Sequence, residues 1–382
     1  MKGVAILGAT GSIGRSALAV LDQHRERFRA VAVTANRNGR ALEEIVARVR
    51  PQVAVVVEGA VDTGVRNGTS WHAGREALIA AATHPDADIV INALVGAAGL
   101  EPTLAALDSG KRVALANKET LVCGGPLVLE AASSGGGELI PIDSEHSAIL
   151  QCLQGCRTKD VDRVILTASG GPFRTWSEEA LKHVGPADAL RHPTWDMGSK
   201  ITIDSATLAN KALELIEAHF LFGLGYERLS AVVHPQSIIH SMVEFVDGSV
   251  LAQMGFPTME IPVLYAMAYP ERLSYETRRF DPVSASGLTF EHIRESAFPA
   301  FGLGIRAGRA GGAYPAVYNA ANEVAVAAFL EGSLSFLGIG PAIEDALERW
   351  TGGGITDVGS ILEADGWARS VTRTFIDRHV HC

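Results

Sequence analysis

The sequence lacks the patterns that assign a protein to several large functional classes. Its four cysteines include no C-x-x-C pair, so neither a zinc knuckle nor a disulfide framework is indicated, and reduced thiols in a cytoplasmic protein fit best. A membrane-spanning helix needs a run of about 20 apolar residues, and no run in this sequence is that long. The first residues also lack the features of a signal peptide. With 33 basic and 43 acidic residues, the net charge of -10 argues against nucleic-acid binding but leaves a local basic pocket for a small anion open.

What is present is the composition of a globular protein. The chain has 382 residues, of which 47% are hydrophobic and 20% charged, and its length predicts two or three domains. In residues 1–142, short apolar runs alternate with helix-like stretches. We interpret these runs as buried parallel strands at 4–8, 30–35, 53–57, 88–94 and 112–117. This alternation predicts an α/β fold whose first domain is a Rossmann-like, doubly wound parallel sheet.

The pattern changes after residue 142. Residues 143–270 contain β-branched runs, an Asp-Gly turn at Asp247 and the amphipathic stretch "SATLANKALELIEAHFLFG", read as one long helix. They predict a central α+β catalytic domain with a small sheet. Residues 271–297, rich in Pro, Ser and Arg, are interpreted as a connecting segment, and residues 298–382 as a C-terminal helical domain.

Three glycines follow the first predicted strand in "LGATGSIG". Gly8, Gly11 and Gly14 stand where a strand ends and a helix begins. Such glycines let the backbone approach a pyrophosphate, and the helix N-terminus offers it unpaired N–H groups. The spacing indicates a dinucleotide site, the alternative being a tight turn that binds nothing.

The end of the second strand indicates which dinucleotide is bound. NAD-binding folds usually have an acid there for the ribose 2′-OH, whereas this strand ends in "TANRN", with Arg37 and no acid. A guanidinium can bind a 2′-phosphate, so the segment favours NADP. The alternative is that Arg37 is a solvated loop cation.

The fifth predicted strand ends in "ANKET", which places Asn117, Lys118 and Glu119 at the edge where open parallel sheets bind ligands. Lys118 would reach a substrate oxygen near the nicotinamide. Asn117 and Glu119 would contact the cofactor's ribose or amide.

Two acids flank a serine in "PIDSEH". In an extended chain, Asp143 and Glu145 would point to the same face, where two anions repel unless a cation or a shared proton lies between them. The plainer alternative is a solvated strand end.

A polar stripe runs along the predicted helix from Ser205. Thr207, Asn210, Lys211 and Glu214 recur at helical spacing. The stripe is either the solvent-exposed face of the helix or a binding face. Its small number of charged residues favours a binding face. Glu214 would add a third carboxylate to Asp143 and Glu145, and an oxygen-only set selects a hard cation. The neutral and cationic donors suit a phosphate, and they are Ser144, Ser169, Ser205, Asn210 and Lys211.

The aperiodic stretch "LRHPTWDMGSK" is typical of a flap that closes over a substrate. Trp195 would be part of this flap, although a core anchor is the more common fate of a tryptophan. His192 considered alone is more typical of a structural histidine.

Seven motifs, in this order, resemble those of the 1-deoxy-D-xylulose 5-phosphate reductoisomerase family. They are "GATGSIG", "ANKET", "PIDSEH", "ASGGPF", "RHPTWDMGSKITIDSATLANKALE", "HPQSIIHSMVEF" and "NAANEVAVAAFL". The resemblance implies a homodimer, formed through the central sheet, that uses NADPH and a divalent cation, Mg²⁺, Mn²⁺ or Co²⁺. It implies conversion of 1-deoxy-D-xylulose 5-phosphate to 2-C-methyl-D-erythritol 4-phosphate in the non-mevalonate route to isoprenoids.

The resemblance also implies roles for single residues. The metal ligands are Asp143, Glu145 and Glu214, and Lys118 and His192 complete the catalytic group. The NADPH contacts are Thr10, Gly11, Ser12, Ile13, Asn36, Arg37, Asn38, Asn117, Glu119 and Gly198. The substrate contacts are Lys118, Ser144, Glu145, Ser169, His192, Ser205, Asn210, Lys211 and Glu214, beneath a flap of Trp195 and Met197.

One position departs from the family, which usually has glycine where this chain has Asn36. Since Asn tolerates φ > 0 better than other non-glycine residues, we expect the loop shape to survive.

Two other functions stay open. A related NADP enzyme of the semialdehyde dehydrogenase kind would need a nucleophilic Cys in a convincing context, and homoserine dehydrogenase is a further candidate. A catalytically silent NADP-binding sensor would have lost the carboxylates or the phosphate donors.

Overall fold

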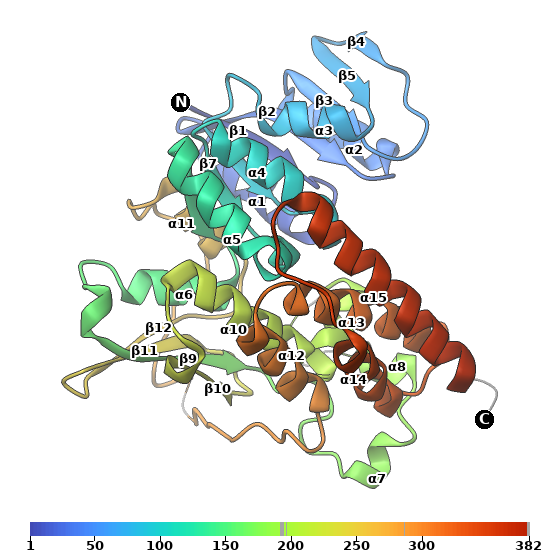
Figure 1. The fold of residues 1–382 in the computed structure, drawn as a ribbon. Helices are drawn as coiled ribbons and strands as arrows, with labels where there is room; N and C mark the ends of the chain where they lie inside the picture. The colour runs from blue at the N-terminus through green and yellow to red at the C-terminus, as the bar shows by residue number, and fades with distance from the viewer. Residues whose placement is uncertain (192–194, 196, 286, 380–382) are drawn as a thin grey trace. The chain divides into compact units, whose positions relative to one another are not determined.

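The computed structural model describes residues 1–191, 195, 197–285 and 287–379 (Figure 1). The chain forms two compact units. The first unit comprises Met1–Leu121, Gly125–Ser147 and Thr258–Thr277, and the second comprises Val122–Gly124, Ala148–Pro257 and Arg278–Cys382. None of the described helices combines the length and apolar composition needed to cross a bilayer.

The first unit is built on an eight-stranded sheet with the order β4-β5-β3-β2-β1-β6-β7-β8. Its strands are β1 (Lys2–Leu7), β2 (Phe28–Ala35), β3 (Val53–Val56), β4 (Gly64–Arg66), β5 (Thr69–Ala73), β6 (Ile89–Asn92), β7 (Arg112–Leu115) and β8 (Glu138–Pro141). All neighbours are parallel except β4 and β5. The predicted Rossmann-like parallel sheet is confirmed, because its central strands are continuous runs of buried Val, Ile and Ala.

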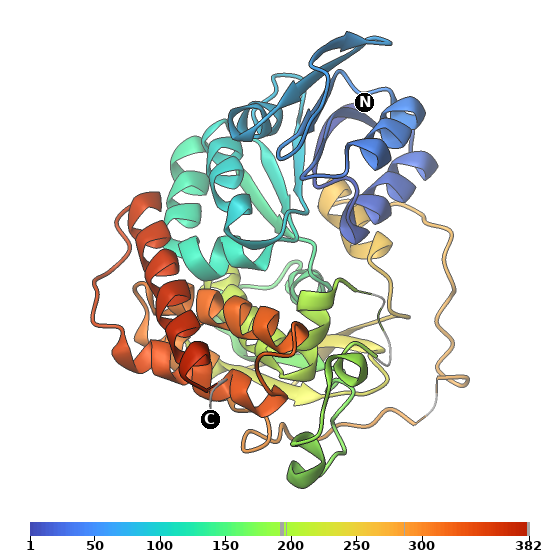
Figure 2. The ribbon, with the colours of Figure 1, turned by 90° about the vertical axis from the view of Figure 1, so that its right-hand side faces the viewer.

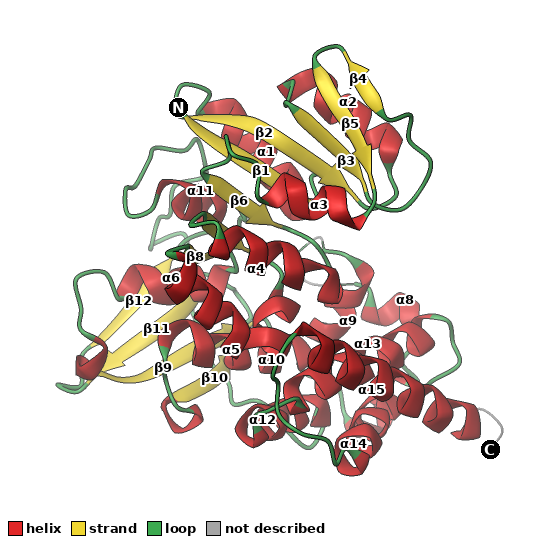
Figure 3. Cartoon of the chain, turned by 45° about the horizontal axis from the view of Figure 1, so that its top comes forward, coloured by secondary structure: helices red, strands yellow, loops and turns green. Residues whose placement is uncertain are grey.

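Helices follow the strands of this sheet. They are α1 (Ser12–Gln23), α2 (Gly39–Val49), α3 (Arg75–Ala82), α4 (Leu100–Asp108), α5 (Lys118–Gly135) and α6 (Ser144–Cys152), with the 3₁₀ turn η1 (Gly96–Gly99). Helices α1 to α4 pack against the sheet, and α6 begins in the first unit and ends in the second. α3 and α4 pack together and lie in front of the yellow strands in Figure 3. The β4–β5 hairpin was not predicted, although its Asn67-Gly68 turn, with φ of 50° and 82°, is a hairpin signal in the sequence.

A late segment returns to the first unit. α11 (Glu260–Ala268) packs against α1, and its Glu260 accepts a 2.8 Å hydrogen bond from Ser16. Arg27 forms a 2.7 Å ion pair with Glu271 in the same segment. Residues 258–277 therefore belong with the first unit, whereas the sequence-based boundaries split them between the central domain and the connecting segment.

The second unit combines a small sheet with helices. Its strands, in the order β10-β9-β11-β12, are β9 (Val161–Ala168), β10 (Leu229–Val233), β11 (Ile239–Phe245) and β12 (Val250–Met254). β9 and β10 are parallel and the other pairs are antiparallel, with the predicted turn at Gly248 (φ 83°) between β11 and β12. The α+β character expected for the central region is confirmed.

The helices of the second unit come from two parts of the chain. They are α7 (Glu178–Leu181), α8 (Pro186–Ala189), α9 (Ser199–Ala206), α10 (Ala209–Phe222), α12 (Pro299–Ala310), α13 (Tyr314–Leu330), α14 (Ile339–Arg349) and α15 (Val358–His379). Short 3₁₀ turns are η2 (Thr158–Asp160), η3 (Tyr226–Arg228) and η4 (Phe336–Gly338). α13 packs against α12, α14 and α15, the orange and red helices of Figure 2, and also against α9 and α10. The expected C-terminal helices are thus present, in one unit with the small sheet.

The long helix predicted from Ser205 is two helices. α9 ends at Ala206, Leu208 takes the left-handed conformation with φ 59°, and α10 begins at Ala209. A buried leucine rarely adopts this conformation, so the surrounding packing fixes the break. The prediction of one continuous helix was wrong at this point.

Candidate active site

The glycine loop forms a tight turn between β1 and α1. Gly8 has φ 85°, and a Cβ on Gly14 would lie 2.5 Å from the Gly8 carbonyl oxygen, so each of these positions requires glycine. Gly11 caps α1, and both Gly11 and Ser12 are exposed. This is the predicted strand–turn–helix arrangement, with an open helix N-terminus. Arg15, which the sequence analysis did not select, donates to the Thr10 carbonyl at 2.9 Å and brings a cation to the loop.

The segment after β2 is exposed and has an acidic neighbour. The Arg37 guanidinium donates to the Glu58 carboxylate with N–O distances of 2.8 and 2.6 Å. Glu58 follows β3, and its backbone N–H donates to the Asn36 carbonyl at 2.7 Å. Asn38 caps α2 by accepting from Ala41 N at 3.0 Å. Sequence reasoning missed Glu58 because only the pairing of β2 with β3 brings it beside Arg37.

Asn36 does not adopt the conformation for which asparagine was considered suitable. Among the described residues, the non-glycine residues with positive φ are Arg50, Asn67, Leu208 and Ser237. The backbone at position 36 therefore needs no left-handed residue, and replacement of glycine there carries no strain of that kind.

Asn117 is the N-cap of α5 and holds the neighbouring loop. Its side chain accepts from Thr120 N at 3.0 Å and donates to the carbonyls of Leu94 and Gly96 at 3.0 and 3.1 Å. It also donates to Glu119 at 2.8 Å and is 1% exposed. The amide is thus committed to fixing the start of α5, where Lys118 and Glu119 lie.

Lys118 and Asp143 meet where the parallel strands β7 and β8 end. The ammonium of Lys118 donates to Oδ2 of Asp143, and Nδ1 of His146 lies 3.2 Å from its Oδ1. Burial alone would raise the pKa of the Asp143 carboxyl, but Lys118 and His146 hold this pKa well below its usual range. Asp143 is therefore an anion placed beside a cation. His146 was not selected from the sequence, although it follows Asp143 by three residues.

The "PIDSEH" stretch is not an extended strand. Asp143 immediately precedes α6, and Glu145 lies in the first turn of that helix. Oδ1 of Asp143 accepts from Glu145 N at 3.3 Å, and Ser144 Oγ donates to Glu145 Oε2 at 2.6 Å. The prediction that the acids share a face of a strand was wrong. A helix start brings them together, since aspartate readily accepts from the first N–H groups of a helix.

The turn that follows Ser169 contacts the end of α9, where Ser205 lies. After β9 the chain turns through Gly170 (φ 84°) and Gly171 (φ 68°), and Gly171 N donates to Ser169 Oγ at 3.3 Å. A Cβ on Gly171 would lie 2.8 Å from the carbonyl oxygen of Ser205, so glycine allows this turn to contact the end of α9. The Ser-Gly-Gly turn expected from the sequence thus adjoins the predicted phosphate residue Ser205.

The polar stripe of α10 is buried. Lys211 is 4% and Glu214 1% exposed, and Thr207, which precedes α10, is 4% exposed. The alternative interpretation, that the stripe is the solvent-exposed face of the helix, was therefore wrong for these three residues. Asn210 and Lys211 each donate to one oxygen of the Glu214 carboxylate. Within the part of the chain that the structure describes, the buried Oδ1 of Asn210 has no hydrogen-bond partner.

The flap region is only partly described. Gly198 is exposed and caps α9, and its carbonyl accepts from Thr202 Oγ1 at 2.9 Å. Trp195 and Met197 are half-buried, so Trp195 is not a fully buried core anchor. His192 lies outside the described residues.

The site residues thus fall into two groups. The first unit carries the glycine loop, residues 36–38, Asn117 to Glu119 and Asp143 to Glu145. The second unit carries Ser169, Gly198, Ser205, Asn210, Lys211 and Glu214. Each group supplies one part of the predicted chemistry: a dinucleotide turn with a carboxylate pair, and a hydroxyl, amide and ammonium set with one carboxylate.

Comparison with known families gives three matches in chain order. Residues 4–125 match the model described as 1-deoxy-D-xylulose 5-phosphate reductoisomerase. Residues 139–222 match its C-terminal domain, and residues 254–371 match the domain described as the DXP reductoisomerase C-terminal domain. Together the matches cover most of the chain.

Relatives of the same description match over nearly the whole length. The 1-deoxy-D-xylulose 5-phosphate reductoisomerase of Symbiobacterium thermophilum is 49% identical over 97% of this chain and 98% of its own. That of Gloeobacter violaceus is 46% identical over 99% and 98%. A solved structure of the enzyme from Zymomonas mobilis in complex with NADPH is 41% identical, with TM-score 0.91 over 98% and 99% of the two chains. Another, in complex with NADPH, fosmidomycin and magnesium, is 37% identical, with TM-score 0.92 over 99% and 98%.

Proposed function

The chain belongs to the 1-deoxy-D-xylulose 5-phosphate reductoisomerase family, and on this premise we propose that it converts 1-deoxy-D-xylulose 5-phosphate to 2-C-methyl-D-erythritol 4-phosphate. The reaction rearranges the carbon skeleton to an aldehyde, and hydride from NADPH reduces this aldehyde to the product, which makes the protein an oxidoreductase of isoprenoid precursor biosynthesis. The observation that carries the proposal is similarity over almost the full length of both chains, in a sequence that has all the predicted metal and substrate residues.

NADPH is the proposed reductant, as in the solved relatives in complex with it. The glycine loop supports this because the exposed start of α1 can receive a pyrophosphate. Arg37 supports the phosphorylated cofactor, since its exposed guanidinium can pair with a 2′-phosphate. Asn36, Asn38, Asn117, Glu119 and Gly198 remain proposed contacts by family resemblance, with the Asn117 amide fixing the start of α5.

Asp143, Glu145 and Glu214 are the proposed ligands of a divalent cation. The donor set fits, because it offers carboxylate oxygens alone, as Mg²⁺ and Mn²⁺ prefer, and because the lowered pKa keeps Asp143 ionised. A solved relative holds magnesium. When bound, the cation would polarise the substrate's ketone and neighbouring hydroxyl. The proposal of this ligand set rests on the motifs shared with the family.

The protein's own groups would bind and orient the substrate around that centre. The ammonium of Lys118 donates to Asp143, and its other N–H groups can donate to a substrate oxygen on which negative charge develops. Ser169, Ser205, Asn210 and Lys211 are the proposed phosphate donors. Ser169 directly follows β9, Ser205 lies near the end of α9, and the other two lie in the first turn of α10. Ser144 would contact the carbon backbone, and His192, Trp195 and Met197 would cover the substrate and exclude water.

A homodimer and a cytoplasmic location are further parts of the proposal. The edge strand β12 supports the dimer, because Val250 and Leu251 are each 48% and Met254 37% exposed on a strand whose outer edge has no partner strand among the described residues. Light scattering should give twice the 40.3 kDa of one chain at micromolar concentration, and a monomer would contradict the dimer. Cys156, a free and exposed thiol, is consistent with a reducing compartment.

NADPH oxidation in the presence of the pentulose phosphate tests the function. We expect oxidation that needs both the substrate and a divalent cation, stops on chelation and returns on addition of Mg²⁺. A protein that bound NADPH without oxidising it under these conditions would be the silent sensor, and the proposal would fail. Oxidation supported by a semialdehyde or by homoserine instead would identify a related dehydrogenase.

A further inference from the structure

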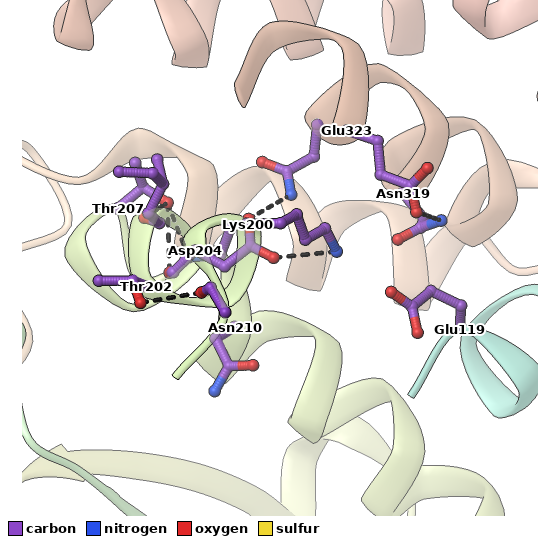
Figure 4. A network of polar contacts seen from close by, with 12 residues as sticks. Glu119, Lys200, Thr202, Asp204, Thr207, Asn210, Asn319 and Glu323 are labelled. Atoms are coloured by element: carbon purple, nitrogen blue, oxygen red, sulfur yellow. Dashed lines mark hydrogen bonds and ion pairs between the residues drawn. The ribbon is translucent and has the colours of Figure 1, made fainter. Parts of the chain in front are cut away.

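A buried carboxylate connects α9 to α13 in the second unit (Figure 4). Asp204, on α9, is 1% exposed. Its Oδ2 lies 2.9 Å from Nζ of Lys200, one turn earlier on the same helix. Its Oδ1 accepts a 2.7 Å hydrogen bond from Nδ2 of Asn322, a fully buried residue of α13. One oxygen thus engages its own helix and the other a helix that lies 118 residues away in sequence.

α13 is itself held by polar contacts with α15. Nδ2 of Asn319 donates to Glu323 at 3.2 Å. Arg369 of α15 donates to Glu323 at 2.5 Å and to Asp365 at 2.6 and 2.9 Å. The helix that carries Asn322 is therefore held in place by α15, which fixes the position of the Asn322 amide beside Asp204.

Asp204 lies close in the chain to the proposed phosphate residues. It directly precedes Ser205, and α9 begins directly after Gly198 at the end of the flap region. Beyond the end of α9 the chain turns at Leu208 into α10, whose first turn carries Asn210 and Lys211. A rotation or shift of α9 would therefore move Ser205 and the start of α10 together.

The contacts of Asp204 are not expected to add much to the stability of the folded protein. Removing a carboxylate from water costs free energy that a buried ion pair often fails to recover, and an apolar side chain of similar volume can be as stabilising. The contact instead fixes the position and orientation of α9 relative to α13, because a hydrogen bond requires a particular distance and angle, which apolar packing does not.

We propose that Asp204 is a positioning residue for the substrate's phosphate group, acting through Ser205. Its bond to Asn322 sets the position of α9 on α13, and so sets the Ser205 hydroxyl for the phosphate. The inference rests on the proposed function, since it needs Ser205 to bind that group.

Two substitutions at Asp204 test the role. Asp204→Asn keeps an oxygen acceptor for Asn322, whereas Asp204→Leu removes it and keeps the same branched arrangement of side-chain heavy atoms. We expect Asp204→Leu to raise both the KM for the pentulose phosphate and the inhibition constant of inorganic phosphate by about tenfold, the scale of one misplaced hydrogen bond to a charged group. The kcat should change less than about threefold, and NADPH affinity should be unchanged. Asp204→Asn should restore KM to within about threefold of the parent value, by the same scale.

A stability control separates positioning from general destabilisation. Ile343, on α14, is fully buried, and Ile343→Ala should lower the melting temperature without raising KM. If Ile343→Ala raised KM as much as Asp204→Leu, the effect would be one of stability and the proposal would fail. If Asp204→Leu did not fold, Asn322→Leu removes the same hydrogen bond from the other side and has the same expected result.

Ser205→Ala distinguishes this inference from the proposed function. It should raise KM and the phosphate inhibition constant, and combination with Asp204→Leu should add little further, because both act on one contact. If Ser205→Ala left both constants unchanged, the proposed phosphate site itself would be wrong. If Ser205→Ala raised them and a folded Asp204→Leu did not, only the positioning role would be overturned.

Discussion

The contact between Arg37 and Glu58 leads to a prediction about cofactor preference. The guanidinium that would pair with the 2′-phosphate of NADPH is already paired with a carboxylate, at 2.6 and 2.8 Å. A bound phosphate must share or displace Glu58, and the two anions repel. Replacing Glu58 by Gln keeps the shape and removes the negative charge. We therefore expect Glu58→Gln to bind NADPH more tightly.

The exposure of the pair sets the size of the effect. The side chains of Arg37 and Glu58 are 78% and 53% exposed, so water screens the charges strongly. Exposed pairs of this kind contribute about 0.2–1 kcal/mol, and two unit charges about 4 Å apart in water interact by about 1 kcal/mol. The KM for NADPH should thus fall by up to about fivefold, since about 1.4 kcal/mol corresponds to a factor of ten. The KM for NADH, which has no 2′-phosphate, should not change.

Initial rates with NADPH and NADH at low and high salt check the prediction. The gain should shrink as salt screens the charges. Glu43→Gln is the matched control, because Glu43 is similarly exposed, pairs with Arg66 in the same unit and makes the same change in charge. An equal gain with NADH, or an equal gain from Glu43→Gln, would refute the reasoning, since either would show a general effect of net charge.

Three other substitutions have defined outcomes. Arg37→Ala should narrow the preference for NADPH over NADH; an unchanged ratio of kcat/KM values would mean that Arg37 does not contact the phosphate. Gly14→Ala should abolish NADPH binding or destabilise the first unit, because the new Cβ would lie 2.5 Å from the Gly8 carbonyl oxygen, and calorimetric titration with NADPH measures this. Glu214→Gln should weaken metal binding and abolish turnover while NADPH binding persists. Normal turnover at limiting Mg²⁺ would remove Glu214 from the ligand set, and a melting curve should accompany the assay because the buried Lys211 ammonium donates to this carboxylate.

The sequence predicted the parts of the fold that repeat a regular pattern. Alternating apolar runs and helical stretches indicate a parallel sheet, and the Asp-Gly turn marks the hairpin of β11 and β12. The predicted strand-to-helix turn at Gly8 is present because glycine spacing there reflects local sterics. The site residues in contiguous motifs were assigned by family resemblance, and their roles stay predictions.

Features that depend on packing between distant segments could not be read from the pattern. Leu208 has a left-handed backbone that its residue type disfavours, so only the buried surroundings of α9 and α10 explain the break. Glu145 was placed on a strand because a two-residue spacing suits one, yet the chain turns into a helix at Asp143. Glu58 was overlooked because the pairing of β2 with β3 brings Arg37 beside it, and Asp204 because the packing of α13 on α9 brings Asn322 to it.

The return of α11 to the first unit has a consequence for biosynthesis of the chain. Residues 258–277 complete that unit, with Glu260 bonded to Ser16 and Glu271 to Arg27. The ribosome therefore makes all four strands of the second unit's sheet before it has delivered the last helix of the first unit. Domains generally fold as units in order of synthesis. Here the N-terminal unit cannot complete its folding until residue 277 has emerged from the ribosome. Until then, the surface of α1 that contacts α11 stays uncovered.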